Sequence, residues 1–422
     1  MVNKDFDVIV YGATSFVGKI LCDYLVNEYA EPKLNWAMAA RSEQKLQALQ
    51  TALGDNAQNV PMLVADSFDE ASLQALCDRT AVIISTVGPY ALYGELLVKL
   101  CAESGTDYCD LTGEAQWIRR MISRYQSEAQ RSGARIVHCC GFDSIPSDLG
   151  VKFLQEHALQ RFGSCCNRVK MRVKGTRGGA SGGTIASGIN LVKEAAKDPA
   201  LREELQDSYS LCPENHEFSL TQHSVDVEYD EDYSSWVGPF LMAAINTRIV
   251  LRSNALMQPP YGKEFRYDEA TLTGDGRAGE KRAKCLARLS RVGMFALAVA
   301  PIRWIVIRFF LPKPGQGPSK EQQVNGYYDL RFFGSTPQGE ELRIKLTGDR
   351  DPGYGSTAKM LAQAAISLCR DVDKDAIAGG FLTPATVFGP PIFKRLQEQA
   401  GMTFELLSFS DSSAATPRPD SD

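Results

Sequence analysis

Six short apolar segments recur between residues 5 and 141, and their spacing restricts the fold more than any other feature of the chain. They read DVIVYG, LNWAMAAR, VPMLVAD, AVIISTVG, TDYCDLTG and ARIVHCCG, and helix-compatible stretches separate them. Strands that alternate with helices build a parallel, doubly wound sheet whose ligand crevice lies at the carboxyl ends of the strands. We therefore predict an α/β fold with such a sheet in residues 1–150, and we expect chemistry in the loops that follow its strands.

The pattern changes after Gly150. The segment NRVKMRVKG alternates polar and apolar residues, and VNGYYDLRFFGSTPQGEELRIKLTGD contains two strand-like runs joined by a Gly/Pro loop. Such alternation is typical of half-buried antiparallel strands. We predict a second, α+β domain with a mostly antiparallel sheet over 151–350, C-terminal helices over 351–405 that return to the first domain, and a disordered tail over 406–422.

Composition and charge exclude several classes of partner. The 422 residues carry a formal net charge of −5 and no Lys/Arg run, so we expect no nucleic-acid partner. The 11 cysteines include no C-x-x-C pair, so we expect reduced thiols, with neither a metal site nor a disulfide framework. The first residues have no signal-peptide pattern, which predicts a cytoplasmic protein.

The first strand runs into the loop GATSFVG, which Gly12 and Gly18 bracket. In a strand–turn–helix unit the first glycine permits the turn, the last lets the helix approach the strand, and N–H groups at the helix N-terminus bind a pyrophosphate. Ser15 stands where a middle glycine is usual. An ordinary strand-to-helix turn is the alternative, but the position in the first βαβ unit favours dinucleotide binding.

The second strand ends in Arg41 and Ser42, at the place where NAD enzymes carry an acidic residue for the ribose 2′-OH. A guanidinium suits a 2′-phosphate, so we predict NADP(H) as the cofactor, with NAD(H) as the alternative. Arg41 could also be a solvated surface residue. Asp66 ends the third strand, where it either approaches the adenine or caps a helix.

The loop after the fourth strand contains Val87, Gly88 and Pro89, beside the place of a nicotinamide ring in a doubly wound fold. Tyr90 or Tyr93 could donate a proton there, or could only pack on the cofactor. We take Tyr90 as a catalytic candidate.

Polar residues after the fifth and sixth strands lie at the same rim. Glu114 could orient a substrate or begin a helix. In HCCGFDSIPSDLG, His138 could assist protonation, while Asp143 and Ser144 could contact the substrate. His138 could instead be a hydrogen-bonded core residue, and the polar residues that follow could cap a helix.

The stretch GTRGGASGGTIASG has paired glycines and hydroxyls, so its backbone can approach a ligand, although flexible turns use the same residues. We treat it as a substrate loop, with Gly182, Gly183 and Thr184 as its candidate residues.

Residues 292–311 are apolar apart from two arginines. Their length approaches the roughly 20 residues of a membrane span, but a mid-segment arginine costs about 2.5–3.5 kcal/mol and Pro301 interrupts the helix, so we do not expect a transmembrane helix. Two alternatives stay open, a buried helix pair or a surface whose basic fringe binds anionic headgroups. That fringe comprises Arg288, Arg291, Arg303, Arg308 and Lys313.

The segments GATSFVG, VGPYALYG, YCDLTGE, HCCGFDSIPSDLG and SGGT follow one another along the chain. In this order the chain resembles the saccharopine dehydrogenase-like oxidoreductases, most closely the branch of the bacterial trans-acting enoyl reductases and their eukaryotic lipid-droplet relatives. The likeness extends to GGFLTPATVFGPPIFKRLQ, and GFDSIPSDLG is its specific part. It implies a Rossmann domain, a second α+β domain and a nicotinamide cofactor. The cofactor residues that it implies here are Gly12, Thr14, Ser15, Phe16, Val17, Gly18 and Arg41, where Ser15 departs from the family's usual glycine.

The expected function is NAD(P)H-dependent reduction of a C=C bond in a lipid or polyketide acyl chain. Fold similarity does not transfer chemistry, so two alternatives stay open. One is a saccharopine-type, amine-forming dehydrogenase, and the other is a non-catalytic nucleotide-binding protein at lipid surfaces. The expected partners are a small-molecule or acyl-chain substrate, a peripheral lipid surface and a second copy of the chain in a homodimer.

Overall fold

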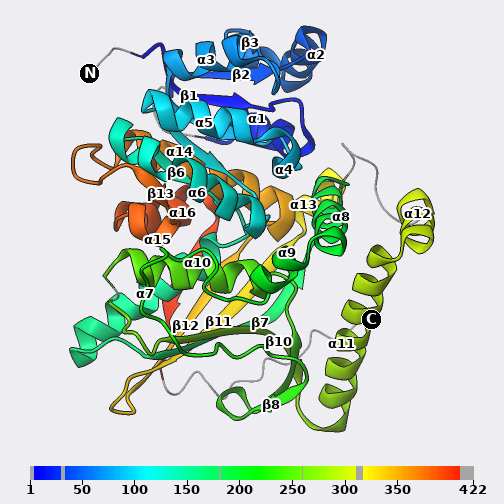
Figure 1. Ribbon diagram of the computed structural model, residues 1–422, viewed down its shortest axis with the longest axis vertical. Coiled ribbons are helices and arrows are strands. Elements are labelled where there is room, and N and C mark those ends of the chain that lie inside the picture. Colours follow the sequence, from blue (N-terminus) through cyan, green and yellow to red (C-terminus); the bar gives the residue numbers. More distant parts are fainter. Residues whose placement is uncertain (1–3, 30–33, 180–181, 259, 310–316, 409–422) are drawn as a thin grey trace.

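The computed structural model describes residues 4–29, 34–179, 182–258, 260–309 and 317–408. Two seven-stranded sheets lie one above the other along the longest axis of the molecule (Figure 1). The loops at the carboxyl ends of the first sheet face the region between the two sheets, where the candidate site lies.

The first sheet contains β1 (Phe6–Tyr11), β2 (Trp36–Ala40), β3 (Met62–Val64), β4 (Thr80–Ser85), β5 (Asp107–Asp110), β6 (Arg135–Val137) and β13 (Gly380–Leu382). All neighbours in the order β13-β6-β5-β4-β1-β2-β3 pair in parallel. This confirms the predicted doubly wound, Rossmann-type sheet. The order reverses between β1 and β4, and a ligand crevice is expected at such a switch point.

Helices cover both faces of this sheet, which explains why its strands are nearly continuous apolar runs. Val8 and Val82 lie in the cluster with α1 (Phe16–Asn27) and α2 (Glu43–Leu53). Ile9 and Ile83 lie in the cluster on the opposite face. The helices of that face are α3 (Glu70–Arg79), α5 (Glu95–Ser104) and α6 (Ala115–Ser132).

The second sheet contains β7 (Arg168–Arg177), β8 (Glu228–Asp230), β9 (Ser235–Pro239), β10 (Arg266–Gly274), β11 (Tyr327–Ser335), β12 (Glu341–Gly348) and β14 (Met402–Leu406). Its order is β14-β12-β11-β7-β10-β9-β8, and only the pair β7–β10 is parallel. This confirms a mostly antiparallel second sheet. It is covered by α7 (Ile145–Phe162) and α10 (Ala243–Leu256).

A buried hydrogen-bond network joins α7 and α10 to α15 (Pro384–Val387). Asp148 on α7 accepts hydrogen bonds from Ser253 Oγ (2.6 Å) and from Ala385 N–H (2.8 Å). Because α7 begins directly after the loop that follows β6, this network fixes that loop against the second sheet.

The C-terminal segment 351–405 was expected to consist of helices that return to the first domain. α14 (Thr357–Arg370) packs on β1, β4 and β5 and against α16 (Pro391–Ala400), and it is buried on nearly all sides. The segment also supplies a strand to each sheet, β13 and β14, which the sequence reading missed. The predicted domain boundary at 150 lies inside α7.

Residue 406 was placed in a disordered tail, but it ends β14, where strand pairing with β12 orders it, and residues 409–422 lie outside the described part. All eleven cysteines are free thiols in the structure.

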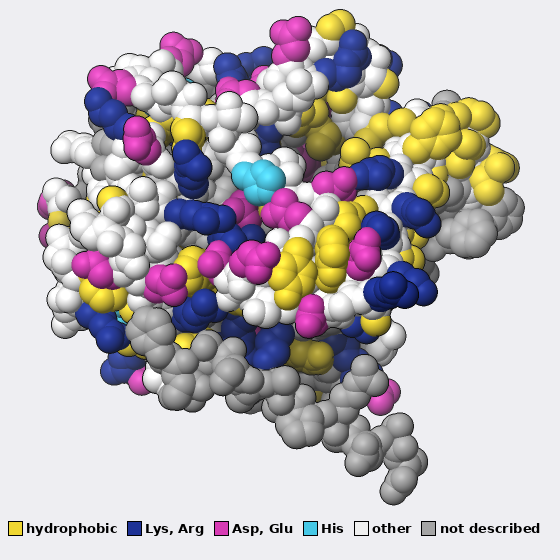
Figure 2. Space-filling view, turned by 90° about the horizontal axis from the view of Figure 1, so that it is seen from below, with side chains coloured by type: hydrophobic (Ala, Val, Ile, Leu, Met, Phe, Trp, Pro, Cys, Tyr) yellow, Lys and Arg dark blue, Asp and Glu magenta, His cyan; other side chains and the backbone are white. Residues whose placement is uncertain are grey.

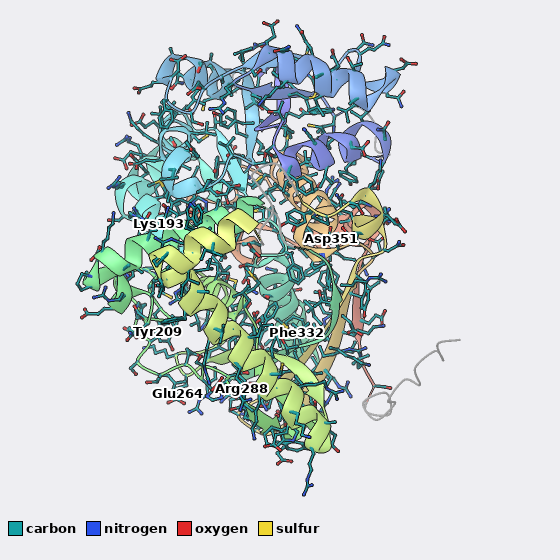
Figure 3. The ribbon with its side chains drawn as sticks, turned by 90° about the vertical axis from the view of Figure 1, so that its right-hand side faces the viewer. Lys193, Tyr209, Glu264, Arg288, Phe332 and Asp351 are labelled. Carbon is teal, nitrogen blue, oxygen red and sulfur yellow. The ribbon has the colours of Figure 1, made fainter. Side chains whose placement is uncertain are left out.

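The apolar segment 292–311 falls on α11 (Gly276–Ala298) and α12 (Ala300–Phe309), and its last residues lie outside the described part. α11 packs on β9 and β10 through small residues, including Ala283 and Ala287, while its second half stands apart from the sheets at the right-hand edge of the molecule (Figure 1). Figure 3 shows α11 and α12 running over that side of the molecule. Phe295 and Trp304 are 63% and 64% exposed. This exposure rules out the alternative of a buried helix pair.

Apolar side chains gather over this end of the molecule, with basic side chains beside them (Figure 2). Among the described residues, no helix is long and apolar enough to cross a membrane.

Candidate active site

The turn between β1 and α1 requires glycine at two positions. Gly12 has φ +86°, and a Cβ there would lie 2.7 Å from both Thr86 Oγ1 and Val87 Cγ2. A Cβ on Gly18 would lie 2.2 Å from the carbonyl oxygen of Gly12. The two glycines therefore bring the start of α1 against the ends of β1 and β4.

Ser15 holds this turn through its hydroxyl. It caps α1 by accepting a hydrogen bond from Gly18 N–H (2.9 Å). Thr86 donates its single hydrogen to the Gly12 carbonyl (2.9 Å), so Ser15 must be the donor in its 2.9 Å contact with Thr86. Ser15 thus closes the turn and has no hydrogen left for a phosphate.

Three backbone N–H groups at this turn face no acceptor within the described chain. They belong to Thr14, Phe16 and Val17, the residues before and within the first turn of α1. Unpaired N–H groups at a helix N-terminus bind anions, because their hydrogens and the helix dipole both favour negative charge. The turn therefore fits the pyrophosphate of a dinucleotide.

The three candidate cofactor residues in the loops after β2 and β3 differ in whether their side chains already have partners. Ser42 caps α2 by accepting from Lys45 N–H (3.3 Å), and Asp66 accepts from Phe68 N–H (3.0 Å). Arg41 is exposed and makes no hydrogen bond or ion pair with any described residue. Ser42 and Asp66 thus shape their loops, while the Arg41 guanidinium is free for a 2′-phosphate.

The loop after β4 continues through Gly88 and a cis Pro89 into the short helix α4 (Tyr90–Tyr93). The Tyr90 hydroxyl donates to the Ser85 carbonyl (2.9 Å). Burial, together with the nearby Asp110 carboxylate, raises the pKa of Tyr90 well above its usual value. These contacts favour a structural role for Tyr90 over the predicted proton transfer.

Glu114 ties together three loops of the site. Its carboxylate accepts from Tyr90 N–H (2.8 Å), from Ala91 N–H (3.0 Å) and from Ser187 Oγ (2.7 Å). Ser187 lies on α8 (Gly182–Lys197). Glu114 therefore anchors α4 and α8 beside the loop after β5, and a substrate contact would compete with these hydrogen bonds.

His138 lies in an aromatic core. Its Nδ1 is 2.7 Å from Asp110 Oδ2. The centre of its ring lies 5.0 Å from the ring centre of Trp117 and 5.7 Å from that of Phe381. The side chain is only 3% exposed, and its Nε2 has no partner among the described residues. Asp110, which the sequence reading did not select as a site residue, fixes the orientation of this ring. The packing favours the core-histidine alternative.

The loop between β6 and α7 has an unusual backbone. Cys139 and Ser144 have φ +61° and +96°, a region that costs energy for residues with a side chain. Ser144 Oγ donates to Asn246 Oδ1 on α10 (3.0 Å). Asp143 is half-buried and has no hydrogen-bond partner in the described chain, and burial raises its pKa to about 7. Strained backbone of this kind often accompanies a functional site.

Gly182, Gly183 and Thr184 were expected in a flexible loop, but they form the first turn of α8. α8 contacts α11 and lies near the first sheet (Figure 1). Ser187, which donates a hydrogen bond to Glu114, was not among the candidates from the sequence, because no motif distinguishes it from the neighbouring hydroxyl residues.

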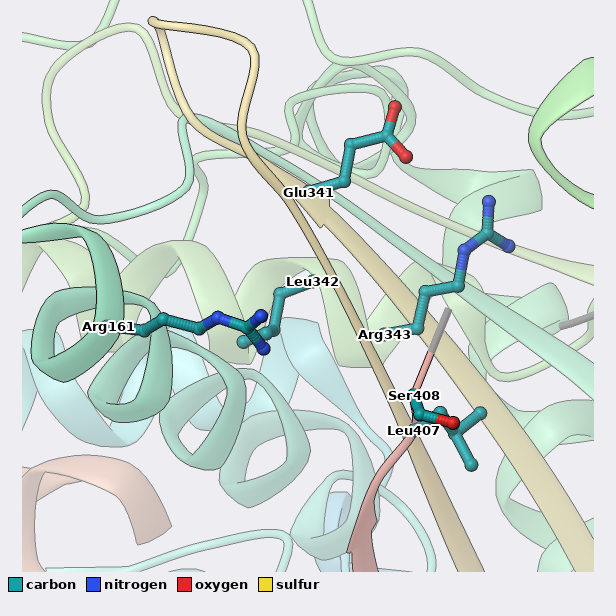
Figure 4. A pocket seen from close by; sticks show the side chains of 6 residues that line it. All are labelled: Arg161, Glu341, Leu342, Arg343, Leu407 and Ser408. Carbon is teal, nitrogen blue, oxygen red and sulfur yellow. The ribbon is translucent and has the colours of Figure 1, made fainter. Parts of the chain in front are cut away.

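A hollow lies away from these loops. It is lined by Arg161, Glu341, Leu342, Arg343, Leu407 and Ser408 (Figure 4). Arg161 is near the far end of α7, so this hollow is remote from the loop that precedes α7. Across the described ranges, no group of three or more His, Cys, Asp or Glu side chains could hold a metal ion.

The turn with its unpaired amides, the free arginine after β2 and the parallel sheet are the features of a dinucleotide-binding, Rossmann-type fold. Residues 8–137 match the family model of the saccharopine dehydrogenase NADP-binding domain. The cofactor is therefore NADP(H), which the unpaired amides and Arg41 suit.

Relatives cover nearly the whole chain. A Mycobacterium tuberculosis protein named provisionally as a trans-acting enoyl reductase is 38% identical over 410 residues, covering 93% of this chain and 96% of the relative. The trans-acting enoyl reductase of Mycobacterium leprae is 34% identical over 404 residues, with the same coverage. The chain therefore belongs to the saccharopine dehydrogenase-like oxidoreductases, in the branch of the trans-acting enoyl reductases, and is an NADP-dependent oxidoreductase.

A solved structure shares the fold. The glutamate-forming saccharopine dehydrogenase of Saccharomyces cerevisiae superposes with a TM-score of 0.52 at 14% identity, covering 96% of this chain and 100% of that chain.

Replacing Arg41 with alanine tests the cofactor assignment. We expect Arg41→Ala to weaken NADPH binding by about 1.5–3 kcal/mol, because a charge-assisted hydrogen bond to the 2′-phosphate is lost, and to leave NADH binding nearly unchanged. Calorimetric titration of both cofactors measures the difference. The matched control is Arg131→Ala, which removes an exposed arginine at the opposite end of the first sheet. Equal losses for NADPH and NADH would contradict the assignment.

Proposed function

We propose that the protein reduces the C=C bond of an α,β-unsaturated acyl thioester with NADPH. The observation that carries this proposal is the full-length similarity of 34–38% to proteins named as trans-acting enoyl reductases. The cofactor-binding turn supports it, because its free amides suit a pyrophosphate and Arg41 suits a 2′-phosphate.

In this proposal, different residues contact different parts of the cofactor. The amides of Thr14, Phe16 and Val17 bind the pyrophosphate, and Arg41 binds the 2′-phosphate. The loop Val87–Pro89 lines the nicotinamide side of the crevice. When bound, NADPH supplies a hydride for the substrate.

Substrate recognition falls to the loops after β5 and β6 and to the start of α8. Glu114 joins the loop after β5 to α8 through Ser187, and its other hydrogen bonds hold α4 beside them. The network around Asp148 fixes the loop after β6 against α10 and α15. A preorganised rim of this kind orients an acyl chain without rearranging on binding.

The amine-forming alternative is less well supported. Saccharopine carries several carboxylates, which would need free cationic groups. Arg248 and Arg252 on α10 are buried and already bonded: Arg248 donates to the Leu205 carbonyl (2.7 Å) and Arg252 to the Phe381 carbonyl (2.6 Å). Neither is free for a substrate carboxylate.

Turnover with enoyl thioesters tests the proposal. We expect the purified protein to oxidise NADPH in the presence of enoyl thioesters of suitable chain length, and to yield the saturated thioester. Absorbance of NADPH and mass spectrometry of the acyl product measure this. Tight NADPH binding without turnover across chain lengths would favour the non-catalytic alternative, and turnover only with an amino acid and a 2-oxo acid would favour the amine-forming one.

We further propose that the exposed end of α11 and α12 contacts an anionic lipid surface, from which the enzyme takes its substrate. Leu289, Val292 and Phe295 are exposed on α11, and Trp304 is exposed on α12. Arg288 directly precedes Leu289 on α11 (Figure 3), so the surface combines apolar area with positive charge. That combination favours anionic headgroups. The expected homodimer and cytoplasmic location stay predictions.

Liposome sedimentation tests the lipid surface. We expect wild type to sediment at low salt with vesicles containing phosphatidylglycerol, and Phe295→Glu with Trp304→Glu to stay in the supernatant, because both substitutions put charge on exposed apolar positions. Leu159→Glu is the control, since Leu159 is exposed on α7 away from this surface. The proposal fails if wild type stays in the supernatant, or if the double variant sediments as wild type does. Circular dichroism checks that the double variant is folded, as substitutions at exposed positions should leave it.

A further inference from the structure

Most polar side chains at the rim formed by the loops after β5 and β6 already have partners. Tyr90 donates to a backbone carbonyl, Glu114 accepts three hydrogen bonds, Ser144 donates to Asn246, and His138 is enclosed by aromatic rings. Asp143 differs from them, because its carboxyl group has no hydrogen bond or ion pair with any residue that the structure describes.

Asp143 lies where it can reach a ligand. Its Oδ2 is 3.1 Å from the position that a Cβ on Gly113 would occupy, so the carboxyl group lies against the backbone of the loop after β5. Met242 Cε is 4.0 Å from the same position and gives this spot an apolar side. Asp143 is half-buried, so part of the residue is open to a substrate.

The loop that carries Asp143 is held on both sides. Phe142 N–H donates to Thr357 Oγ1 (2.9 Å) on α14, and Ser144 donates to α10. With Cys139 and Ser144 at positive φ, the backbone is fixed in a costly conformation. The loop therefore presents the Asp143 carboxyl group at a defined place, on the β5–β6 side of the switch point where the nicotinamide ring is expected.

The surroundings leave this carboxyl group protonated in about half of the molecules at neutral pH. Burial is the cause that raises the pKa of Asp143 to about 7. The neighbouring titratable group on its own loop is the Cys139 thiol, whose pKa burial raises well above its usual value, so the thiol is neutral. A carboxyl group of this kind can donate a proton at physiological pH.

We propose that Asp143 donates the proton that completes reduction of the acyl chain. This inference rests on the proposed function. After hydride has reached the β-carbon, the negative charge lies on the α-carbon and thioester oxygen of the substrate. The O–H bond of Asp143 breaks, a C–H bond forms at the α-carbon, and the resulting carboxylate regains a proton from solvent.

Kinetics of three variants test this role. We expect Asp143→Asn to lower kcat by about 100- to 10,000-fold, because an amide does not transfer this proton, and Asp143→Glu to restore part of the rate. In wild type, kcat should fall as pH rises above about 7, where the carboxyl group loses its proton, and this fall should be absent in Asp143→Asn. Asp55→Asn, at an exposed aspartate just after the end of α2, is the control for the substitution itself.

Two readouts do not depend on the rate. Carbon NMR of protein labelled at the aspartate carboxyl groups should show two groups that titrate near pH 7, Asp143 and the hydrogen-bonded Asp148, and Asp143→Asn should remove one of them. In deuterated water, wild type should add deuterium to one face of the α-carbon, and the residual product of Asp143→Asn should carry it on both faces.

The outcomes separate this inference from the proposed function. If wild type reduces enoyl thioesters and Asp143→Asn keeps its rate, pH profile and product stereochemistry, the role of Asp143 is wrong and the proposed function stands. If wild type reduces no enoyl thioester, the proposed function fails and the inference fails with it.

Discussion

The close approach of α1 to the ends of β1 and β4 is the contact on which the rest of the site depends. Gly12 and Gly18 leave no room for a side chain, and a chain of hydrogen bonds from Ser15 to Thr86 to the Gly12 carbonyl closes the turn. The hydroxyl that replaces the usual middle glycine is therefore part of the turn and does not obstruct it. What remains free is a set of backbone amides, and these give the helix N-terminus its affinity for an anion.

The sites around this turn follow from its geometry. Because the strand order reverses between β1 and β4, the loop after β2 lies on one side of the crevice and the loops after β5 and β6 lie on the other. Arg41 then falls on the side suited to the adenosine end of the cofactor, and Asp143 on the side suited to the reacting end. Glu114 joins α4 and α8 on this second side.

The sequence predicted the first sheet well, because each of its strands is a short apolar run followed by a turn. It missed β13, which completes that sheet from a distant part of the chain, since three residues carry no periodic signal. It also placed Gly182 to Thr184 in a loop, because paired glycines favour turns, whereas contacts of α8 with α11 and with Glu114 support a helix there.

Candidate polar residues were harder to rank from sequence than candidate glycines. A glycine in a tight turn has a role that local chain geometry fixes, as Gly12 and Gly18 illustrate. Whether His138, Tyr90 or Asp143 faces a substrate depends on the groups that surround its side chain. Those groups belong to residues on other segments, namely Asp110, Ser85 and Gly113. The sequence identified these three residues together and could not show that Asp143 alone of them is unpaired and open to a ligand.

The central claim is that the free amides of the β1–α1 turn bind the cofactor pyrophosphate. Titration of the isotope-labelled protein with NADP⁺, followed by amide NMR, tests it most directly. The account predicts that the N–H signals of Thr14, Phe16 and Val17 shift strongly and exchange with solvent more slowly once the cofactor is bound. If these signals stay unchanged while NADP⁺ binds and signals elsewhere move, the account is contradicted.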